Sequence, residues 1–344
     1  MRAAGALRTV SASYGQFAGY LLPGGPVAVD VAIVQVGPPG PDGRCSLGVG
    51  AGVTAELVGR VPFVIAEINP AMPYTFGASE CDRTDFDLLV EVEHPLVELA
   101  VPAADDVALA IGGHAASCVP DRATLEFGIG AIPESVLAAL HGRVDLGLHG
   151  GMISDAVVRL AASGALTGAA KSVDAGLHVG AGVVGTRAVF DWVDRNPDVY
   201  LVGSSYSHGI CDLARQRGFC AINSAVEIAA DGSVNAEVAG DRVVSGPGGQ
   251  PDFAIGANLA PDGISILALR STAAGGRVSR IVGELPAASP TTLPRHLVDK
   301  VVTEFGVAEL RSRTVRERTE ALIAIAHPDH RDRLRHEAAQ MGYL

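Results

Sequence analysis

The sequence predicts an α/β fold with largely parallel sheets. Short apolar runs rich in β-branched residues recur along the chain, Ala- and Leu-rich helical patterns separate them, and clusters of Gly and Pro end them. Strands that alternate with helices are typical of parallel sheets, because a parallel connection needs a crossover segment. With 344 residues, 48% of them hydrophobic, the chain is long enough for about two domains with ordinary cores.

The first half of the chain contains three expected strands and two expected helices. The run VAVDVAIVQV at residues 27–36 is typical of a buried strand, and the turn-forming cluster at 37–43 ends it. Proline in the first turn supports a helix that begins at residue 133. The same criteria predict strands at 27–36, 62–68 and 125–129 and helices at 133–140 and 155–162.

The second half continues the alternation. The patterns predict strands at 199–203 and 264–269, a strand or short helix at 296–303, an amphipathic helix at 315–325 and a charged helix at 328–341. Gly, Ala and Ser accumulate between residues 166 and 185. We therefore expect two domains, one over residues 1–165 and one over residues 166–344.

Composition and charge exclude several classes of protein. The net charge of −12 repels phosphate backbones and no Lys/Arg run is present, so we expect no nucleic-acid partner. The five cysteines are scattered without a CxxC pair, which argues against a disulfide framework and a structural metal site. Neither a signal-peptide pattern nor an apolar stretch of membrane-spanning length is present. These observations predict a cytoplasmic protein without a metal or a membrane partner.

Seven strings, taken in order, carry a family resemblance. They are EINPAMP at 67–73, LEFGIGAIP at 125–133, NSAVEIAADGSVN at 223–235, SGPGGQPDF at 245–253, STAAGGRVSRI at 271–281, VTEFGVAEL at 302–310 and ALIAIAHPD at 321–329. Their content and order resemble the acetyl-CoA hydrolase/CoA-transferase family, which includes 4-hydroxybutyrate and butyryl-CoA:acetate CoA-transferases. The resemblance covers residues 27–344, which is nearly the whole chain.

The resemblance implies two tandem α/β domains, each built around an open sheet, with the active site between them. It implies an acyl-CoA substrate that brings coenzyme A, acyl transfer to an enzyme glutamate, a glutamyl-CoA thioester, and a homodimer or larger homo-oligomer. Family members begin with a further strand-and-helix segment that residues 1–26 do not match. We therefore expect a trimmed N-terminal domain, whose sheet edge another subunit or a rearranged N-terminus covers.

Glycine-rich loops are the expected binding elements for coenzyme A. Glycines at 246, 248 and 249 leave backbone N–H groups free to approach a thioester or a phosphate. The resemblance assigns Gly248 and Gly249 to the oxyanion hole, and the loop at 128–133 precedes a helix N-terminus, a position suited to an anion. The full set expected to hold coenzyme A is Gly128, Gly130, Ala131, Ile132, Pro133, Gly246, Gly248, Gly249, Gln250, Asp252, Phe253, Ser271, Thr272, Gly275 and Gly276.

Two departures from the family affect the chemistry. The family's catalytic glutamate lies in a string that corresponds to DLGLHGGMISDA at 145–156, where Gly151 takes the glutamate position. In the string SYSHGI at 205–210, His208 takes the position of an active-site asparagine. Glycine cannot form an acyl anhydride or a thioester, so glutamyl chemistry is not expected at residue 151. The expected substrate pocket consists of His149, Gly150, Gly151, Met152, Ser207 and Glu227.

The role of His208 has two interpretations. As a catalytic residue it acts as a general base on an acceptor amine, alcohol or water, while the Gly248–Gly249 loop stabilises the oxyanion. As a structural residue it is a packed or surface histidine of a decayed site. A Cys211–His208 nucleophile pair is a third arrangement.

Three further positions bear on these interpretations. Glu227 is a candidate replacement nucleophile, and Glu134 is expected to serve the dipole of its helix. Ala274 replaces a lysine of the family, so a phosphate contact in that loop has to come from Arg270 or Arg277.

Three hypotheses about function follow. In the first, the protein is an acyl-CoA-dependent enzyme that moves the acyl group directly to a small non-CoA acceptor or to water, without a glutamyl-CoA intermediate. In the second, it is a protein or subunit that binds a CoA thioester without catalysis. In the third, it is a true CoA-transferase whose glutamate comes from another residue or from a partner chain. The first is the expectation carried forward, because the loops for coenzyme A are retained while residue 151 is glycine.

Overall fold

A nine-stranded sheet forms the centre of the fold in the computed structural model, which describes residues 10–344. The strand order is β23-β22-β18-β13-β7-β8-β10-β12-β4, and all neighbouring strands are parallel except β22 and β23. The strands are β4 (Phe76–Gly77), β7 (Thr124–Phe127), β8 (Gly147–His149), β10 (His178–Gly180), β12 (Val199–Leu201), β13 (Phe219–Asn223), β18 (Ile264–Ala268), β22 (Lys300–Thr303) and β23 (Gly306–Glu309).

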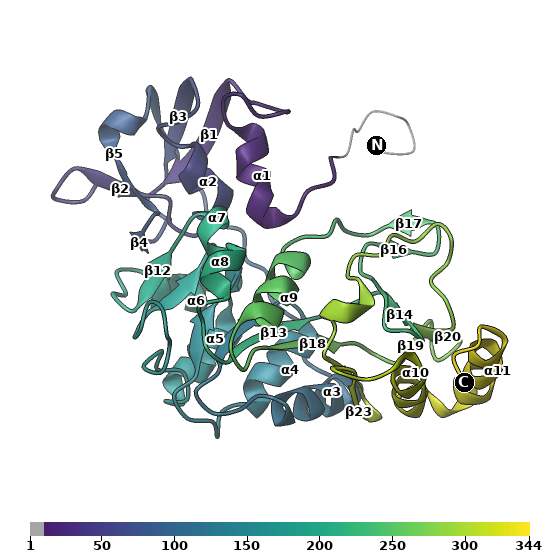
Figure 1. Cartoon of the computed structure of the whole chain (residues 1–344). Helices are drawn as coiled ribbons and strands as arrows, with labels where there is room; N and C mark the ends of the chain where they lie inside the picture. Colours follow the sequence, from purple (N-terminus) through teal and green to yellow (C-terminus); the bar gives the residue numbers. More distant parts are fainter. Residues whose placement is uncertain (1–9) are drawn as a thin grey trace.

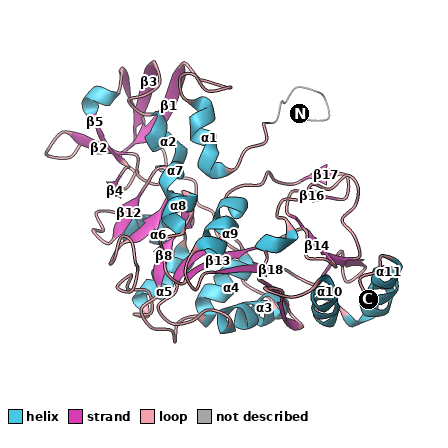
Figure 2. Ribbon diagram, in the orientation of Figure 1, coloured by secondary structure: helices cyan, strands magenta, loops and turns pink. Residues whose placement is uncertain are grey.

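Helices cover both faces of this sheet (Figures 1 and 2). The largest hydrophobic cluster joins one face to α3 (Asp106–Ser117), α4 (Ala131–Ala139), α5 (Asp155–Ala162) and α6 (Arg187–Val193). A smaller cluster joins the other face to α8 (Ile210–Leu213) and α9 (Gln250–Leu259), and α7 (Ser204–Ser207) precedes α8. Largely apolar strands such as β13 and β18 are what a parallel sheet covered on both faces requires.

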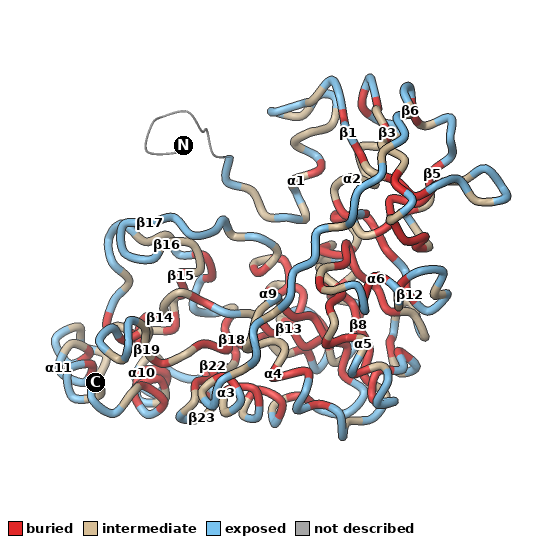
Figure 3. The backbone as a smooth tube through the Cα atoms, turned by 180° about the vertical axis from the view of Figure 1, so that it is seen from behind, coloured by how far each residue is buried: buried red, intermediate tan, exposed pale blue. Residues whose placement is uncertain are grey.

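A separate three-stranded parallel sheet lies at the N-terminal end, in the order β1-β3-β6 (Figure 1, purple and blue). Its strands are β1 (Val31–Val36), β3 (Phe63–Ile68) and β6 (Leu88–Glu91), and its neighbours are α1 (Tyr14–Leu21), β2 (Arg44–Ser46), α2 (Gly52–Leu57), β5 (Glu80–Asp82) and the 3₁₀ turn η2 (Arg83–Asp85). One face packs into a hydrophobic cluster, whereas on the other face Ile33 is 68% exposed. A mostly exposed connection, residues 92–105, runs from β6 to α3 (Figure 3).

The C-terminal part adds small sheets and two helices with their own hydrophobic cluster. These elements are β14 (Glu227–Ala229), β15 (Val234–Asn235), β16 (Val238–Ala239), β17 (Arg242–Val243), β19 (Thr272–Ala273), β20 (Val278–Ser279), β21 (Ile281–Val282), η3 (Arg295–Leu297), α10 (Val315–Ala324) and α11 (Pro328–Gln340). A two-stranded pair, β9 (Met152–Ile153) and β11 (Gly182–Val183), lies beyond the ends of β8 and β10.

The structure confirms the predicted α/β class with open, largely parallel sheets. Every strand and helix predicted from the sequence is found within a few residues of its expected bounds. The segment at 296–303, predicted as strand or short helix, contains both, because η3 leads into β22.

The strands of the nine-stranded sheet come from both sides of residue 165. β7 and β8 precede this residue, yet they lie between β13 and β10, which follow it. The three-stranded sheet, by contrast, is built entirely from residues 31–91. The division into 1–165 and 166–344 stays a prediction, as does the cover for the sheet edge at β1, which pairs only with β3 among the described residues.

Candidate active site

Several segments predicted to form the site follow the carboxyl ends of strands in the nine-stranded sheet, whereas the loop at 246–249 follows β17 and leads into α9. Residues 128–133 follow β7, Gly150 and Gly151 follow β8, and residues 204–208 follow β12. Ser271 comes shortly after β18 in the same way. Because parallel strands share one direction, their carboxyl ends meet at one edge, which is where ligands bind in open α/β sheets.

His208 is buried at this edge, with 5% of its surface exposed. Its ring lies between two aromatic rings, with centroid distances of 4.7 Å to Tyr14 and 4.4 Å to Phe253. The Ser207 hydroxyl lies 2.8 Å from Nδ1 of His208 and hydrogen bonds with it. The pKa of His208 is lowered to about 3, mainly by burial and to a smaller extent by the electrostatic effect of His149. The imidazole is therefore neutral at pH 7.

The imidazole of His208 brings together two glycines that lie far apart in the sequence. A Cβ added to Gly151 would meet Cε1 of His208 at 3.5 Å, which is ordinary van der Waals contact. A Cβ added to Gly249 would meet Nε2 at 2.4 Å, which is far too close. Gly249 therefore has to be glycine for the imidazole to occupy this place, whereas the backbone at Gly151 leaves room for a side chain.

The Gly248–Gly249 loop presents free N–H groups beside His208. Within residues 10–344, neither of these two N–H groups donates a hydrogen bond. Gly249 is also the N-cap of α9, so the positive end of the helix dipole points to the same place. Two backbone donors at a helix N-terminus are the arrangement that stabilises an oxyanion.

Helix α1 is anchored to this loop. The Tyr14 N–H donates to the Gly248 carbonyl at 2.9 Å, and the Gly15 N–H donates to Oδ2 of Asp252 at 3.1 Å. Burial raises the pKa of the Asp252 carboxyl. Gln250, another predicted contact of coenzyme A, donates from Nε2 to the Ser224 carbonyl at 2.9 Å. Both side chains are thus bonded to protein here, and their role toward coenzyme A stays a prediction.

His149 lies in the interior behind His208. It is 0% exposed, its ring centroid is 5.5 Å from that of Tyr206, and Nδ1 is 3.3 Å from Nε2 of Gln216. Burial lowers the pKa of His149 to about 4. Its Nε2 is buried without a hydrogen-bond partner among the described residues. A buried polar atom of this kind needs a water molecule or a ligand group.

A second group of predicted residues lines a pocket of about 350 Å³. Its lining is Val107, Arg270, Thr272, Ala273, Ala274, Gly275, Gly276, Arg280 and Glu304. Arg270 is held by Asp105 through two hydrogen bonds of 2.7 and 3.0 Å. Arg280 lines the same pocket, and burial lowers the pKa of its guanidinium, whose Nε is unpartnered among the described residues.

Arg280 is a residue that sequence reasoning missed. The two arginines expected to replace the family's lysine were Arg270 and Arg277, but Arg277 is exposed and does not line the pocket. Arg280 lies inside the string at 271–281 that carried the resemblance, so the motif contained the signal. Ser271, also in the predicted set, is fully buried and donates from its hydroxyl to Glu304 at 2.6 Å.

The glycines of the loop after β7 face open space. A Cβ on Gly128 or Gly130 would meet no atom within 4 Å among the described residues, and the same holds at Gly246. Gly130 has a φ of 125°, which disfavours other residues, and it is the N-cap of α4. Ala131, Ile132 and Pro133 form the first turn of that helix, and Met152 is half-buried in β9.

The candidates for a substitute nucleophile have other partners. Oε1 of Glu227 accepts from Nδ2 of Asn235 at 2.8 Å. Glu134 accepts from the Ser154 hydroxyl at 3.1 Å and pairs with Arg159. No contact is found between these glutamates and His208. Cys211 is exposed, whereas His208 is buried, so the structure offers no support for a pair between them.

A buried carboxyl that the sequence analysis did not single out lies near Gly150. Glu126 in β7 is 2% exposed, and its Oε2 accepts from Nδ2 of Asn223 at 2.7 Å. Burial raises the pKa of Glu126 to about 8. The only sequence signal was a charged residue in an otherwise apolar strand, TLEF.

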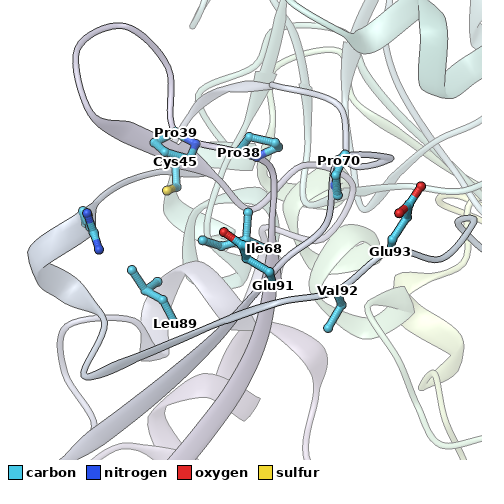
Figure 4. A pocket seen from close by; sticks show the side chains of 10 residues that line it. Pro38, Pro39, Cys45, Ile68, Pro70, Leu89, Glu91, Val92 and Glu93 are labelled. Atoms are coloured by element: carbon cyan, nitrogen blue, oxygen red, sulfur yellow. The ribbon is translucent and has the colours of Figure 1, made fainter.

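Another pocket lies apart from these residues, at the carboxyl ends of β1, β3 and β6 (Figure 4). It measures about 880 Å³, and none of the residues that line it was predicted as a site residue: Pro38, Pro39, Cys45, Ile68, Pro70, Arg83, Leu89, Glu91, Val92 and Glu93. The 10–344 range contains no cluster of side chains suited to a metal ion. Over the same range, every helix is too short or too polar to cross a membrane.

Comparison with known proteins places the chain in a family. Residues 185–338 match the acetyl-CoA hydrolase/transferase C-terminal domain. The 4-hydroxybutyrate coenzyme A transferase of Clostridium kluyveri is 42% identical over 309 residues, which are 90% of this chain and 72% of that protein. The butyryl-CoA:acetate CoA-transferase of Anaerostipes caccae is 36% identical over 89% of this chain and 71% of its own length.

Solved structures agree with the sequence relatives. A 4-hydroxybutyrate CoA-transferase from Porphyromonas gingivalis matches with a TM-score of 0.88 and 34% identity, covering 99% of this chain and 82% of its own. RipA from Yersinia pestis matches with a TM-score of 0.91 and 30% identity, covering 100% of this chain and 78% of its own. The chain therefore belongs to the acetyl-CoA hydrolase/CoA-transferase family, as its motifs predicted.

The contact between Gly249 and His208 generates a first prediction. In Gly249→Ala the new methyl group displaces the imidazole, so we expect turnover of acyl-CoA to be lost while the protein stays folded, since φ of −91° suits alanine. The measurement is release of the coenzyme A thiol, together with the circular dichroism spectrum. Gly113→Ala, at an exposed position of α3 outside the predicted site, is the control, because its methyl group faces open space. Unchanged turnover in Gly249→Ala would contradict a working site at this contact.

The room at Gly151 generates a second prediction. Gly151→Glu places a carboxylate beside His208 without a clash at Cβ, and we expect it to restore some exchange of coenzyme A between an acyl-CoA and a carboxylate. The measurement is incorporation of a labelled carboxylate into acyl-CoA, and Gly151→Gln serves as the control. A folded glutamate variant that shows no exchange would mean that the rest of the pocket has also changed.

Proposed function

We propose that the protein transfers the acyl group of an acyl-CoA directly to a small non-CoA acceptor or to water, without a glutamyl-CoA intermediate. The observation that carries the proposal is the meeting of three residues at the carboxyl edge of the sheet. The imidazole of His208 lies beside both Gly151, which has no nucleophile, and Gly249, whose N–H is free. The names of the relatives support acyl-CoA and a second small molecule as the substrates.

In this proposal the thioester carbonyl lies against the Gly248–Gly249 loop. The two N–H groups stabilise the oxyanion as the acceptor attacks the acyl carbon, because they are held at a helix N-terminus and need no reorganisation. The acceptor occupies the space that a side chain at residue 151 would fill, next to the neutral imidazole of His208.

Coenzyme A extends from the thioester toward the pocket around Arg280. A chain of contacts connects the two places: Gln250 donates to the Ser224 carbonyl, and the adjacent Ala225 carbonyl accepts from Nη1 of Arg280 at 3.3 Å. The Arg280 guanidinium and the N–H groups of Gly275 and Gly276 suit phosphate oxygens. We propose that the diphosphate of coenzyme A binds there.

Binding of a CoA thioester without turnover is the second candidate function. The observation that favours it is the cover over His208, because the Tyr14 and Phe253 rings enclose the imidazole and α1 occupies the Gly248 carbonyl. In that case α1 blocks the approach of an acceptor. The predicted homo-oligomer and cytoplasmic location stay proposals in either case.

Thiol release from a panel of acyl-CoAs distinguishes the two functions. The reactions contain no acceptor, then carboxylates, then alcohols or amines. Release with water, an alcohol or an amine supports direct transfer. Binding of coenzyme A without release under any condition supports the second candidate. Release that requires a carboxylate and leaves a coenzyme A adduct on a glutamate would instead indicate a true CoA-transferase.

His208→Ala generates the third prediction. We expect turnover to fall by about 100-fold or more, because the acceptor loses the polar group beside it, while affinity for coenzyme A stays unchanged. The measurements are steady-state kinetics and calorimetric binding of coenzyme A. Equal loss of turnover and binding would identify the histidine as structural.

A further inference from the structure

The carboxyl of Glu126 lies beneath the strand end that carries Gly150 and Gly151. A Cβ added to Gly150 would meet Cγ of Glu126 at 3.2 Å, so the glutamate side chain on β7 lies close beside the backbone that follows β8. A side chain at residue 150 would crowd it. A Cβ on Gly151, the next residue, would lie 3.5 Å from the His208 ring.

Glu126 points to the face of the sheet on which His208 lies. Residues in register on parallel strands share a face, and Glu126 is in register with Ala221 of β13. Ala221 belongs to the hydrophobic cluster that contains Phe253. The ring of Phe253 in turn contacts that of His208, with centroids 4.4 Å apart.

Glu126 has two neutral partners, the Asn223 side chain and the Ile222 backbone, and no cation pairs with it among residues 10–344. Nδ2 of Asn223 donates to Oε2 at 2.7 Å, which fixes the carboxyl plane. Among residues 10–344, no Lys, Arg or His forms an ion pair with it, whereas most other buried carboxyls in proteins are paired. A buried, unpaired carboxyl at the edge where ligands bind is a position at which a proton can be taken up and released.

We infer that Glu126 is the general base that removes the proton from the acceptor during acyl transfer. This inference rests on the proposed direct transfer. The oxygen or nitrogen of the acceptor forms a bond to the acyl carbon while its proton moves to the Glu126 carboxylate. The C–S bond then breaks, its electron pair leaves with the sulfur as coenzyme A thiolate, and the proton on Glu126 passes to that thiolate.

The acidity of the two candidate bases agrees with this assignment. A general base works best when its pKa lies near the working pH. Burial moves the pKa of His208 down to about 3, which makes it a weak base, and moves that of Glu126 up to about 8. His208 therefore lines the space for the acceptor as a neutral group, and the acceptor class is one that carries a removable proton: water, an alcohol or an amine.

Several titratable groups lie near Glu126. Cys220 on β13 has a raised thiol pKa because of burial, and His149 at the end of β8 has a pKa of about 4. Burial also lowers the pKa of Lys171, whose side chain lies beside Gly147 of β8, to about 8. Glu126 and Lys171 therefore both change charge near pH 8, and a substitution at residue 126 is needed to separate the two titrations.

Glu126→Gln tests the inference, since it keeps the shape of the side chain but cannot accept a proton. We expect turnover with water, alcohols or amines to fall by about 100-fold or more, with binding of coenzyme A unchanged. The rise of turnover with pH up to about 8 in the wild type is expected to disappear in the variant. Glu126→Asp is expected to keep the pH dependence at a lower rate. The matched control is Glu80→Gln, a half-buried glutamate that accepts from the Tyr74 hydroxyl far from the site.

Stability measurements give a second readout that does not depend on activity. The folded protein holds the Glu126 proton more tightly than the unfolded chain, whose ordinary value is 4.5. The stability from this group is therefore full below pH 4.5 and decreases as the pH rises toward 8. The buried histidines, whose pKa values are lowered, contribute a change of opposite sign, so the readout is the difference between two proteins. In urea unfolding at pH 5 and pH 8, the wild type is expected to lose stability relative to Glu126→Gln as the pH rises. An identical pH dependence in both proteins would overturn the inference.

The remaining outcomes separate the inference from the proposed function. Turnover of Glu126→Gln equal to that of the wild type, with the same pH profile, overturns the role of Glu126 and leaves direct transfer intact. A coenzyme A adduct on the peptide that contains Glu126 shows a nucleophile instead of a base, which overturns both. A wild-type protein that binds coenzyme A but releases no thiol from any acyl-CoA also overturns both.

Discussion

The common direction of the parallel strands is the constraint on which the rest of the structure depends. Eight strands of the central sheet run the same way, so the segments after them gather at one edge. Loops that are far apart in the sequence, such as those after β7 and β18, thereby lie along the same edge of the sheet. Helices on both faces bury the apolar strands, and the edge is where backbone groups are left to bind a ligand.

Burial then sets the chemistry at that edge by favouring neutral forms. The same loss of water lowers the pKa of His208 and raises that of Glu126, so both groups are largely uncharged at pH 7. In the proposed transfer, neutral groups around the Gly248–Gly249 N–H pair leave the developing oxyanion as the charge that these donors would stabilise. Under that proposal, the neutral surroundings suit a transition state with a single negative charge on oxygen.

Sequence patterns predicted the fold class, the positions of ten elements and the family, because periodicity and motifs are local properties. They did not predict other elements of the centre, such as β8, β10, β13, α3 and α9. They also predicted Gly151, His208 and Gly249 as parts of one site, and in the structure the imidazole lies beside the backbone of both glycines. The patterns could not reveal Arg280 or Glu126, because the importance of each depends on burial and on neighbours from other strands. The single nine-stranded sheet was equally out of reach, since the order of strands is a tertiary property that local composition does not encode.

The anchoring of α1 has a consequence for the order in which the site assembles. The hydrogen bond from Gly15 to Asp252 joins residues 237 positions apart in the sequence, and Tyr14 closes over His208 through the same contact region. During synthesis the first helix therefore waits, without its partner, until residues 248–253 have left the ribosome. The imidazole can accordingly be enclosed only after six of the nine strands of the central sheet have been synthesised, while β18, β22 and β23 are still to follow.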